Sequence, residues 1–144
     1  NMLLRNDRGV FHDVARAVGL DLQLHEENGG SNGGMVAGDF NSDGWPDLYL
    51  SVFLAPRRLF LNGGQGSFVD ATSGDIPTTG EAFGVAAGDI DNDGDLDLLT
   101  GTVMTEQGPD PPHVLCGDRP DHGGSEPAGR VRRCRSPGPG RWDV

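Results

Sequence analysis

Two nine-residue stretches of the sequence carry acidic and amide side chains in the spacing of a cation-binding loop. They occupy residues 39–47 and 89–97, and both fit the pattern D-x-[DN]-x-D-G-x-x-D. In such a tight turn alternate residues direct oxygens to one interior point, which suits Ca²⁺, a hard cation that takes about six to eight oxygen ligands. The sequence therefore predicts one Ca²⁺ site in each loop, with ligands from Asp39, Asn41, Asp43, Trp45 and Asp47, and from Asp89, Asp91, Asp93, Asp95 and Asp97.

The sixth and seventh positions of each loop have different tasks. The sixth must reverse the chain sharply, which favours glycine, and the loops have Gly44 and Gly94 there. The seventh contributes its backbone carbonyl oxygen, so we expect the carboxylate of Asp95 to point to solvent. We expect the side chain of Trp45 to pack beside its loop, and a place on a ligand-facing surface is the alternative. The second loop offers four ligand carboxylates, whereas the first offers three and the amide of Asn41. The second site should therefore bind Ca²⁺ more tightly.

The loops differ from an EF-hand in length and in their flanks. An EF-hand needs a bidentate acid at position 12 and a helix on each side. Position 12 is Leu50 in one loop and Thr100 in the other, and the neighbouring residues have strand character. Asp, Asn and Gly are also ordinary turn formers, so two acidic turns without a metal are the alternative.

The sequence contains an internal repeat. Residues 34–39, GMVAGD, match residues 84–89, GVAAGD, and the match continues through both loops. Residues 3–13 resemble residues 59–70 in the same way, with one insertion. The order is half a unit, a connector, a whole unit and the first half of another, so we expect a chain cut from a longer array.

Short apolar runs between turn residues predict strands. Residues 48–53 and 96–100 follow the two loops and are flanked by Gly, Asn and Asp. Residues 62–66, NGGQG, predict a hairpin turn with glycine at positive φ. The one helical signal is Asp13, which is placed to cap a short turn that ends at Gly19. The pattern indicates an all-β fold.

One run and its companion hairpin resemble a known family. Residues 83–97, FGVAAGDIDNDGDLD, look like an FG-GAP or VCBS repeat, and residues 58–70 are similar to the segment between loops in bacterial relatives of cartilage acidic protein. The resemblance covers residues 1–104. It implies a β-propeller of the integrin α-subunit kind, with a calcium loop between the first two strands of a blade. The Phe-Gly pair at residues 83–84 is replaced by Gly-Gly at residues 33–34.

The length of the chain limits this architecture. Propellers have about four to eight blades, and at about 50 residues per blade they need at least about 200 residues. With 144 residues, we expect a fragment of about two blades that cannot close a ring. Its exposed edges predict marginal stability or association as an isolated fragment.

Charge is concentrated in the repeat region. Residues 1–104 hold sixteen Asp and Glu against five Arg, which accounts for the net charge of −11, whereas residues 105–144 hold six of each. Eight of the sixteen acids lie in the two loops, and such clustering is costly without a cation. The acidity argues against a nucleic-acid partner. The absence of lysine argues against P-loop, Schiff-base and Ser-Lys chemistry. No Ser-His-Asp or Cys-His arrangement has a recognisable local signature, so no enzyme activity is expected.

Residues 105–144 differ in composition from the rest. They are rich in Pro, Gly and Arg and have almost no apolar periodicity, which predicts a disordered tail. Cys116 and Cys134, the two cysteines of the chain, could form a disulfide here. No stretch approaches the ~20 apolar residues of a membrane-spanning helix, so membrane insertion is not expected. The chain begins with Asn1 rather than Met, so we expect earlier residues in the full protein.

These features together predict a non-enzymatic calcium-binding repeat module with a structural, adhesion or ligand-recognition role. Extracellular calcium modules have Kd values of ~10⁻⁴ to 10⁻³ M, so such sites fill outside the cell, at its surface or in the periplasm, and not in the cytosol. The expected partners are a protein or carbohydrate ligand and the remaining repeats of the propeller. The alternative is a carbohydrate-binding or scaffolding part of a larger extracellular enzyme.

Overall fold

The described part of the chain is built from short antiparallel strands and contains no helix, as the sequence predicts. The computed structural model describes residues 2–20, 31–53, 56–72, 76, 82–90, 92–102, 104–105, 108–109, 113–116 and 132–133. The predicted ligand Asp91 and Cys134, whose pairing with Cys116 the sequence leaves open, lie outside these residues. The strands are β1 (Leu4–Asp7), β2 (Val10–Asp13), β3 (Ser31–Gly38), β4 (Asp47–Phe53), β5 (Arg58–Asn62), β6 (Phe68–Asp70), β7 (Ala82–Gly88), β8 (Asp97–Thr102), β9 (Met104–Thr105), β10 (Gly108–Pro109), β11 (His113–Cys116) and β12 (Arg132–Arg133).

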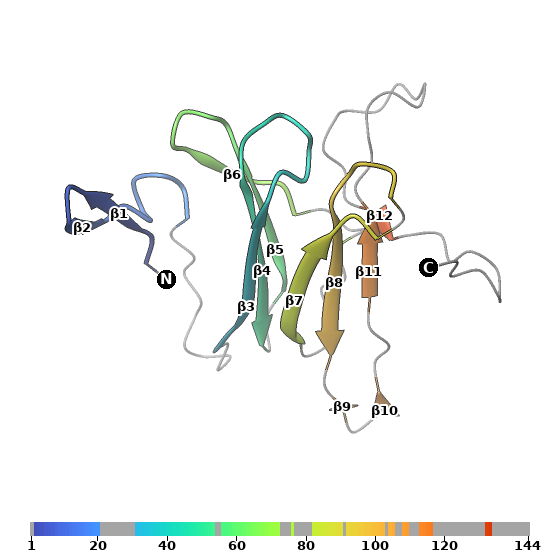
Figure 1. Cartoon of the computed structure of the whole chain (residues 1–144). Coiled ribbons are helices and arrows are strands. Elements are labelled where there is room, and N and C mark those ends of the chain that lie inside the picture. Colours follow the sequence, from blue (N-terminus) through green and yellow to red (C-terminus); the bar gives the residue numbers. More distant parts are fainter. Residues whose placement is uncertain are drawn as a thin grey trace.

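Two four-stranded sheets form the body of the molecule (Figure 1). The first has the order β3-β4-β5-β6 and the second the order β7-β8-β11-β12, with antiparallel neighbours throughout. Residues 39–47 join the first two strands of one sheet, and residues 89–97 join the first two strands of the other. The registers agree, because Gly38 pairs with Asp47 and Gly88 pairs with Asp97. The internal repeat of the sequence is therefore a repeat of structure.

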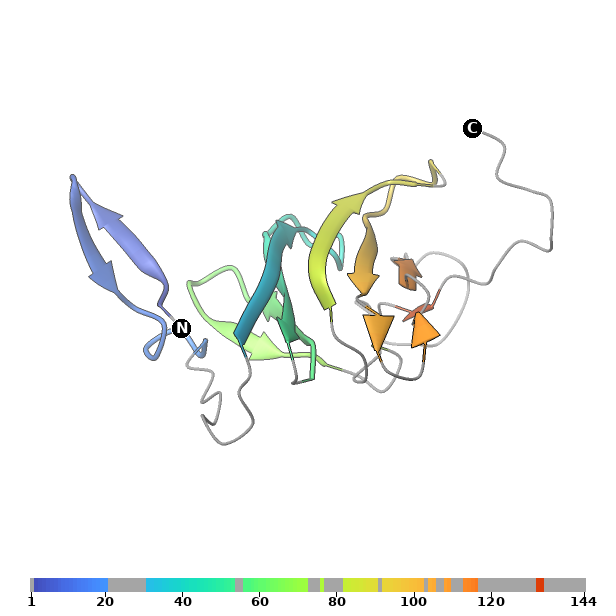
Figure 2. The same ribbon diagram turned by 90° about the horizontal axis from the view of Figure 1, so that it is seen from below.

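The two sheets lie side by side, with β7 next to β3 and β4 (Figures 1 and 2). A shared apolar core fills the space between them. Close packing is required at Gly38, because a Cβ atom there would lie 2.8 Å from Cδ1 of Leu96 in the second repeat. This arrangement is consistent with two adjacent blades of a β-propeller. The buried core consists of Phe40, Tyr49, Leu59, Ile76, Leu98 and Leu115.

The N-terminal hairpin of β1 and β2 resembles the hairpin of β5 and β6 at its open end, although its turn is shorter. In each, the residue after the second strand donates its backbone N–H to a carbonyl oxygen near the start of the first. Val14 donates to Leu3 and Ala71 donates to Leu59, both at 2.8 Å. The predicted equivalence of residues 3–13 with residues 59–70 is thus present in the backbone. β1 and β2 form a separate two-stranded sheet.

A capped turn connects this hairpin to the face of the first sheet. Oδ1 of Asp13 accepts the backbone N–H of Ala15 at 3.0 Å, and the turn ends at Gly19, whose φ is +86°. Only glycine fits there, because a Cβ atom would also lie 2.6 Å from the carbonyl oxygen of Phe68. The predicted cap and stop are both present, and the segment is a turn rather than a helix.

Part of the stretch that the sequence predicts to be disordered is ordered in the structure. Residues 113–115 of β11 pair with residues 98–100 of β8, and β12 pairs with β11 in turn. Leu115 is fully buried in the core shared by the two sheets. The structure corrects the prediction for these residues, because β11 covers an edge of β8 that would otherwise expose unpaired backbone groups. None of the described elements is a helix that could cross a bilayer.

Candidate metal centres

The first loop is coiled around the carboxylate of its first residue. The two carboxylate oxygens of Asp39 accept the backbone N–H groups of Asp43 at 3.0 Å and Gly44 at 2.8 Å. Oδ1 of Asp43 then accepts the backbone N–H of Trp45 at 2.9 Å. Ser42 and Gly44 adopt left-handed φ angles of +57° and +90°, which turn the chain tightly enough to make these contacts.

The second loop repeats this conformation. Asp89 accepts the backbone N–H groups of Asp93 and Gly94, both at 3.0 Å, and Asp93 accepts that of Asp95 at 2.9 Å. The φ angles of Asn92 and Gly94 are +60° and +93°. Two segments with different residues at several positions therefore adopt the same set of hydrogen bonds. Their common fold follows from the shared Asp and Gly positions.

The last aspartate of each loop fixes the loop to its sheet. Asp47 is fully buried, and its two oxygens accept the backbone N–H groups of Phe40 at 2.9 Å and Asn62 at 2.8 Å. Burial raises the pKa of Asp47, and these two hydrogen bonds oppose the rise. Asp97 occupies the same position in the second loop and accepts the backbone N–H of Ile90 at 2.8 Å. Each loop is thus closed from its second residue to its ninth.

The hairpin of β5 and β6 covers the side of the first loop. The indole of Trp45 lies against Gly64, where a Cβ atom would be only 2.5 Å from Nε1. Nδ2 of Asn62 donates to the carbonyl oxygen of Pro46 at 3.0 Å. Trp45 thus packs against the hairpin beside its loop, and half of its surface stays exposed. The sequence did not predict this hydrogen bond from Asn62 to the loop, although the Asn-Gly pair at residues 62–63 did predict the turn.

Asp95 differs from its prediction. Its carboxylate was expected in solvent, but the residue is only 5% exposed, and Oδ1 accepts a hydrogen bond from Oγ of Ser42 at 3.3 Å. The reason is the neighbouring repeat, which brings the first loop against the second. The pattern within one loop carries no information about this contact.

The donor chemistry of the loops suits Ca²⁺, although the side chains do not converge on one point. Within the ranges that the structure describes, no group of three or more His, Cys, Asp or Glu side chains is arranged to hold a metal ion. Asn41 donates from Nδ2 to Oδ2 of Asp43 at 2.8 Å, and Asp39 faces backbone N–H groups. A carboxylate oxygen that accepts one N–H keeps a second lone pair for a cation. The loops contain no Lys, Arg or His that could neutralise their acids.

The two packed antiparallel sheets, each with an acidic loop between its first two strands, define a repeat protein of the β-propeller type. Residues 53–100 match the family described as FG-GAP-like repeat, so the chain carries an FG-GAP-like repeat. Over 107 residues, or 72% of the chain, it is 31% identical to "Cartilage acidic protein 1" of Mus musculus. The chain spans 16% of the length of that protein. The resemblance seen in the sequence is confirmed.

Proposed function

We propose that each of the two loops binds one Ca²⁺ ion. The observation that carries this proposal is the repetition of one loop conformation in two acid-rich segments that contain no basic residue. Repulsion between the carboxylates opposes this conformation unless a cation offsets it. The proposed ligands are the side chains of Asp39, Asn41, Asp43, Asp47, Asp89, Asp91, Asp93 and Asp97, and the backbone carbonyls of Trp45 and Asp95.

The proposed role of the ions is to stabilise the connection between the first two strands of each sheet. A site of this kind is absent in the unfolded chain, so the free energy of metal binding adds to the free energy of folding. Asp47 and Asp97 transmit this effect, because their hydrogen bonds hold the second residue of the same loop. Ca²⁺ supplies charge neutralisation and oxygen coordination, and no chemical reaction is required.

The chain then acts as a non-enzymatic repeat module of a secreted or cell-surface protein. FG-GAP-like repeats are generally structural modules, and the similarity to "Cartilage acidic protein 1" supports an extracellular setting. Millimolar calcium in that setting suits sites with Kd values of ~10⁻⁴ to 10⁻³ M. The surface of the module, with its loops fixed by metal, would bind a protein or carbohydrate ligand.

A calorimetric titration of the whole chain with Ca²⁺, and with Mg²⁺ for comparison, tests this proposal. We expect two Ca²⁺ ions per chain, and one after the substitution Asp93→Ala or Asp43→Ala. The matched control is Asp7→Ala, which removes one exposed acid outside the loops and should leave two. A chain that is folded by circular dichroism but gives no Ca²⁺-specific heat would show that the loops are acidic turns.

A further inference from the structure

The sequence contains the segment Asn-Gly-Gly three times, at residues 28–30, 32–34 and 62–64. Asparagine is a chemically labile residue, and a following glycine makes it more so, because glycine has no side chain to hinder attack by its backbone nitrogen. Among these three asparagines, the structure describes the side chain of Asn62 alone. Its surroundings determine whether this reaction can occur in the folded chain.

The side chain of Asn62 is fixed at both of its polar atoms. Asn62 begins the tip of the β5–β6 hairpin, residues 62–67. Nδ2 donates to the carbonyl oxygen of Pro46 in the first loop at 3.0 Å, and Oδ1 accepts the backbone N–H of Gly64 at 3.0 Å. Deamidation requires Cγ of Asn62 to approach the backbone nitrogen of Gly63, and this rotation breaks both hydrogen bonds.

The backbone of the same segment also opposes the reaction. The nitrogen of Gly63 is the nucleophile, and its N–H donates to the carbonyl oxygen of Ser67 at 2.9 Å. This hydrogen bond retains the proton that the nitrogen must lose before it attacks. Asn62 itself pairs with Phe68 at the end of β5, and its backbone N–H donates to Oδ1 of Asp47 at 2.8 Å. Ring closure therefore requires the hairpin tip to open.

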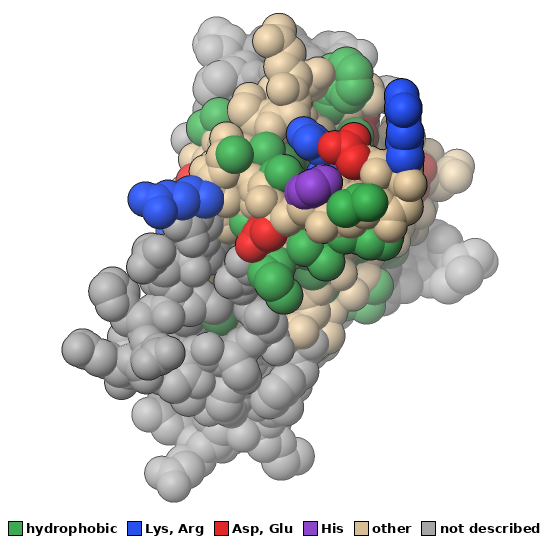
Figure 3. Space-filling model, turned by 90° about the vertical axis from the view of Figure 1, so that its left-hand side faces the viewer, with side chains coloured by type: hydrophobic (Ala, Val, Ile, Leu, Met, Phe, Trp, Pro, Cys, Tyr) green, Lys and Arg blue, Asp and Glu red, His purple; other side chains and the backbone are tan. Residues whose placement is uncertain are grey.

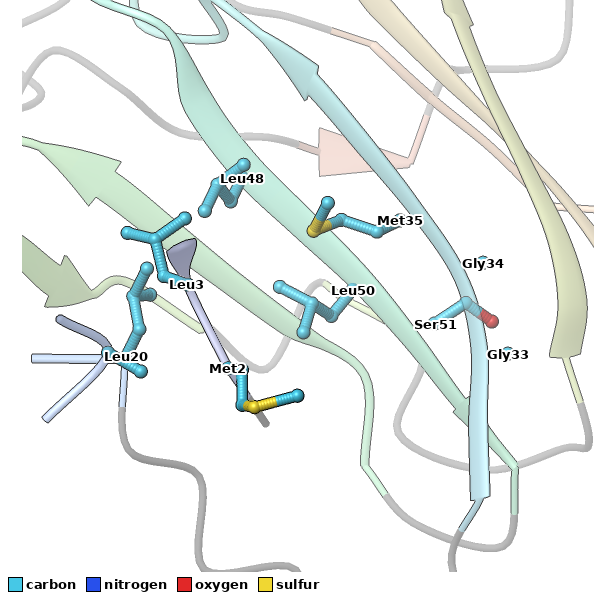
Figure 4. A pocket seen from close by; sticks show the side chains of 10 residues that line it. Met2, Leu3, Leu20, Gly33, Gly34, Met35, Leu48, Leu50 and Ser51 are labelled. Atoms are coloured by element: carbon cyan, nitrogen blue, oxygen red, sulfur yellow. The ribbon is translucent and has the colours of Figure 1, made fainter. Parts of the chain in front are cut away.

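The strands of this hairpin are held by contacts other than those of its tip. Phe60 and Phe68 belong to an apolar cluster with Leu20, and the backbone N–H of Phe68 donates to the carbonyl oxygen of Val18 at 2.7 Å. Figure 4 shows Leu3 and Leu20 of the N-terminal segment beside the first sheet, where they line an apolar groove. Hydrophobic side chains also gather on this side of the molecule (Figure 3). The tip can thus open while the strands stay in place.

We propose that Asn62 is a deamidation site that the contact between the hairpin tip and the first loop keeps closed. When the contact opens, the nitrogen of Gly63 bonds to Cγ of Asn62, and the bond from Cγ to Nδ2 breaks with release of ammonia. Water then opens the resulting succinimide ring to an aspartyl or isoaspartyl residue. Gly63 is exposed, so water reaches the ring. The net reaction consumes one water molecule and releases one ammonia molecule.

The product does not restore the contact. A carboxylate at position 62 has no N–H to donate, and one of its oxygens faces the carbonyl oxygen of Pro46 in place of Nδ2. Its charge also lies close to the buried carboxylate of Asp47, which accepts the backbone N–H of the same residue. An isoaspartyl link lengthens the backbone at the last pair of β5. Deamidation therefore releases the tip from the loop irreversibly.

Peptide mapping of the whole chain by mass spectrometry, after incubation at mildly alkaline pH, tests this proposal. In urea the three asparagines should deamidate at similar rates, because each is followed by two glycines. In a chain that circular dichroism shows to be folded, Asn62 should deamidate at least about tenfold more slowly than in urea, because the reaction passes through a local opening. Equal rates at Asn62 in the two states would overturn the proposal.

Gly64→Ala and Gly66→Ala test the role of the loop in this protection. A Cβ atom at Gly64 would lie 2.5 Å from Nε1 of Trp45 and push the tip away from the loop. Gly66 is the matched control, because its φ of +73° is close to the +76° of Gly64 and a Cβ atom there meets nothing within 4 Å. With each rate divided by the rate of the same variant in urea, Gly64→Ala should deamidate several-fold faster at Asn62. Equal ratios would overturn the part assigned to the loop.

Asn62→Asp carries the aspartyl product from the start and tests its effect. This variant should unfold at a lower urea concentration than the unaltered chain, because the bond to Pro46 is lost. Asn6→Asp is the control, since Oδ1 of Asn6 accepts the backbone N–H of Gly9 and an aspartate keeps that acceptor. It should unfold like the unaltered chain. An Asn62→Asp chain of unchanged stability would overturn the release of the tip.

Discussion

Oγ of Ser42 donates a hydrogen bond of 3.3 Å to Oδ1 of Asp95, and this bond joins the two acidic loops across 53 residues of sequence. Ser42 is the fourth residue of the first loop and Asp95 the seventh of the second. Asp95 is only 5% exposed, so the bond lies within the contact between the two repeats. It makes the packing of neighbouring repeats depend on a residue that a metal-loop pattern leaves unspecified.

A double-mutant cycle of Ser42→Ala and Asp95→Asn measures this bond. Ser42→Ala should lower the free energy of unfolding by about 1 kcal/mol, because it leaves a buried carboxylate with one donor fewer. In a chain that already carries Asp95→Asn, Ser42→Ala should lower the free energy of unfolding by a smaller amount. Urea unfolding of the four proteins checks this. Equal costs in the two backgrounds would show that the charge of Asp95 does not strengthen the hydrogen bond, because asparagine keeps an Oδ1 acceptor.

The contact of Trp45 with Gly64 predicts different effects for two neighbouring glycines. Gly64 and Gly66 have φ angles of +76° and +73°, so alanine meets similar backbone strain at both. Only at Gly64 would the new Cβ atom collide with the indole. Gly64→Ala should therefore destabilise the chain by about 1–2 kcal/mol more than Gly66→Ala. Thermal unfolding measures the difference, and equal losses would contradict the contact.

The single tyrosine of the chain provides a probe of the core. Burial raises the pKa of Tyr49 to about 12, although the charge of Arg57 opposes the rise. The raised pKa stabilises the folded state below the ordinary value of 10.0, and this contribution is lost as the pH rises through about 12. Ultraviolet absorbance of tyrosinate should titrate near 12 in the folded chain and near 10 in denaturant. A folded chain that titrates near 10 would exclude a buried hydroxyl.

Asp70 predicts a loss of stability in acid. Partial burial alone would raise its pKa, but hydrogen bonds from Thr72 and the nearby Arg58 outweigh burial and lower it. A lowered pKa stabilises the folded state at neutral pH, and the contribution disappears as the pH falls through the folded value. Because the pair with Arg58 is partly exposed, Asp70→Asn should cost less than about 1 kcal/mol at pH 7.

Urea unfolding at neutral pH and well below the ordinary pKa of 3.8 measures this dependence on Asp70. The difference between Asp70→Asn and the unaltered chain should vanish at the lower pH. Asp7→Asn is the control, because the pair of Asp7 with Arg5 has the same 2.9 Å separation but is more exposed. A cost for Asp70→Asn that is unchanged in acid would contradict the assignment.

Features set by neighbouring residues in the sequence could be predicted. The all-β fold, the hairpin at residues 62–66 and the capped turn from Asp13 to Gly19 depend on turn chemistry and short apolar runs. The two loops were also located from their spacing alone. In these segments glycine and aspartate determine the backbone locally, so the pattern contains most of the information.

Features set by distant residues could not be predicted. The burial of Asp95 depends on a loop in the preceding repeat, and the pairing of β11 depends on an open edge of β8. Leu115 alone gives no periodic signal within a polar stretch, yet it is buried once that edge is available. Among the described residues the loop carboxylates do not converge on one point, because their orientation depends on side-chain rotation, which the spacing does not determine.

The hydrogen bonds of Asp47 have a consequence for the order of folding during synthesis. They reach residues only 7 and 15 positions away, whereas the bond between the two loops spans 53. Contacts of short sequence separation close with little loss of chain entropy and form early. The first sheet is complete in sequence at Asp70, before β7 has been translated. The hydrogen bonds within the first sheet can thus form before the core that it shares with the second sheet is complete.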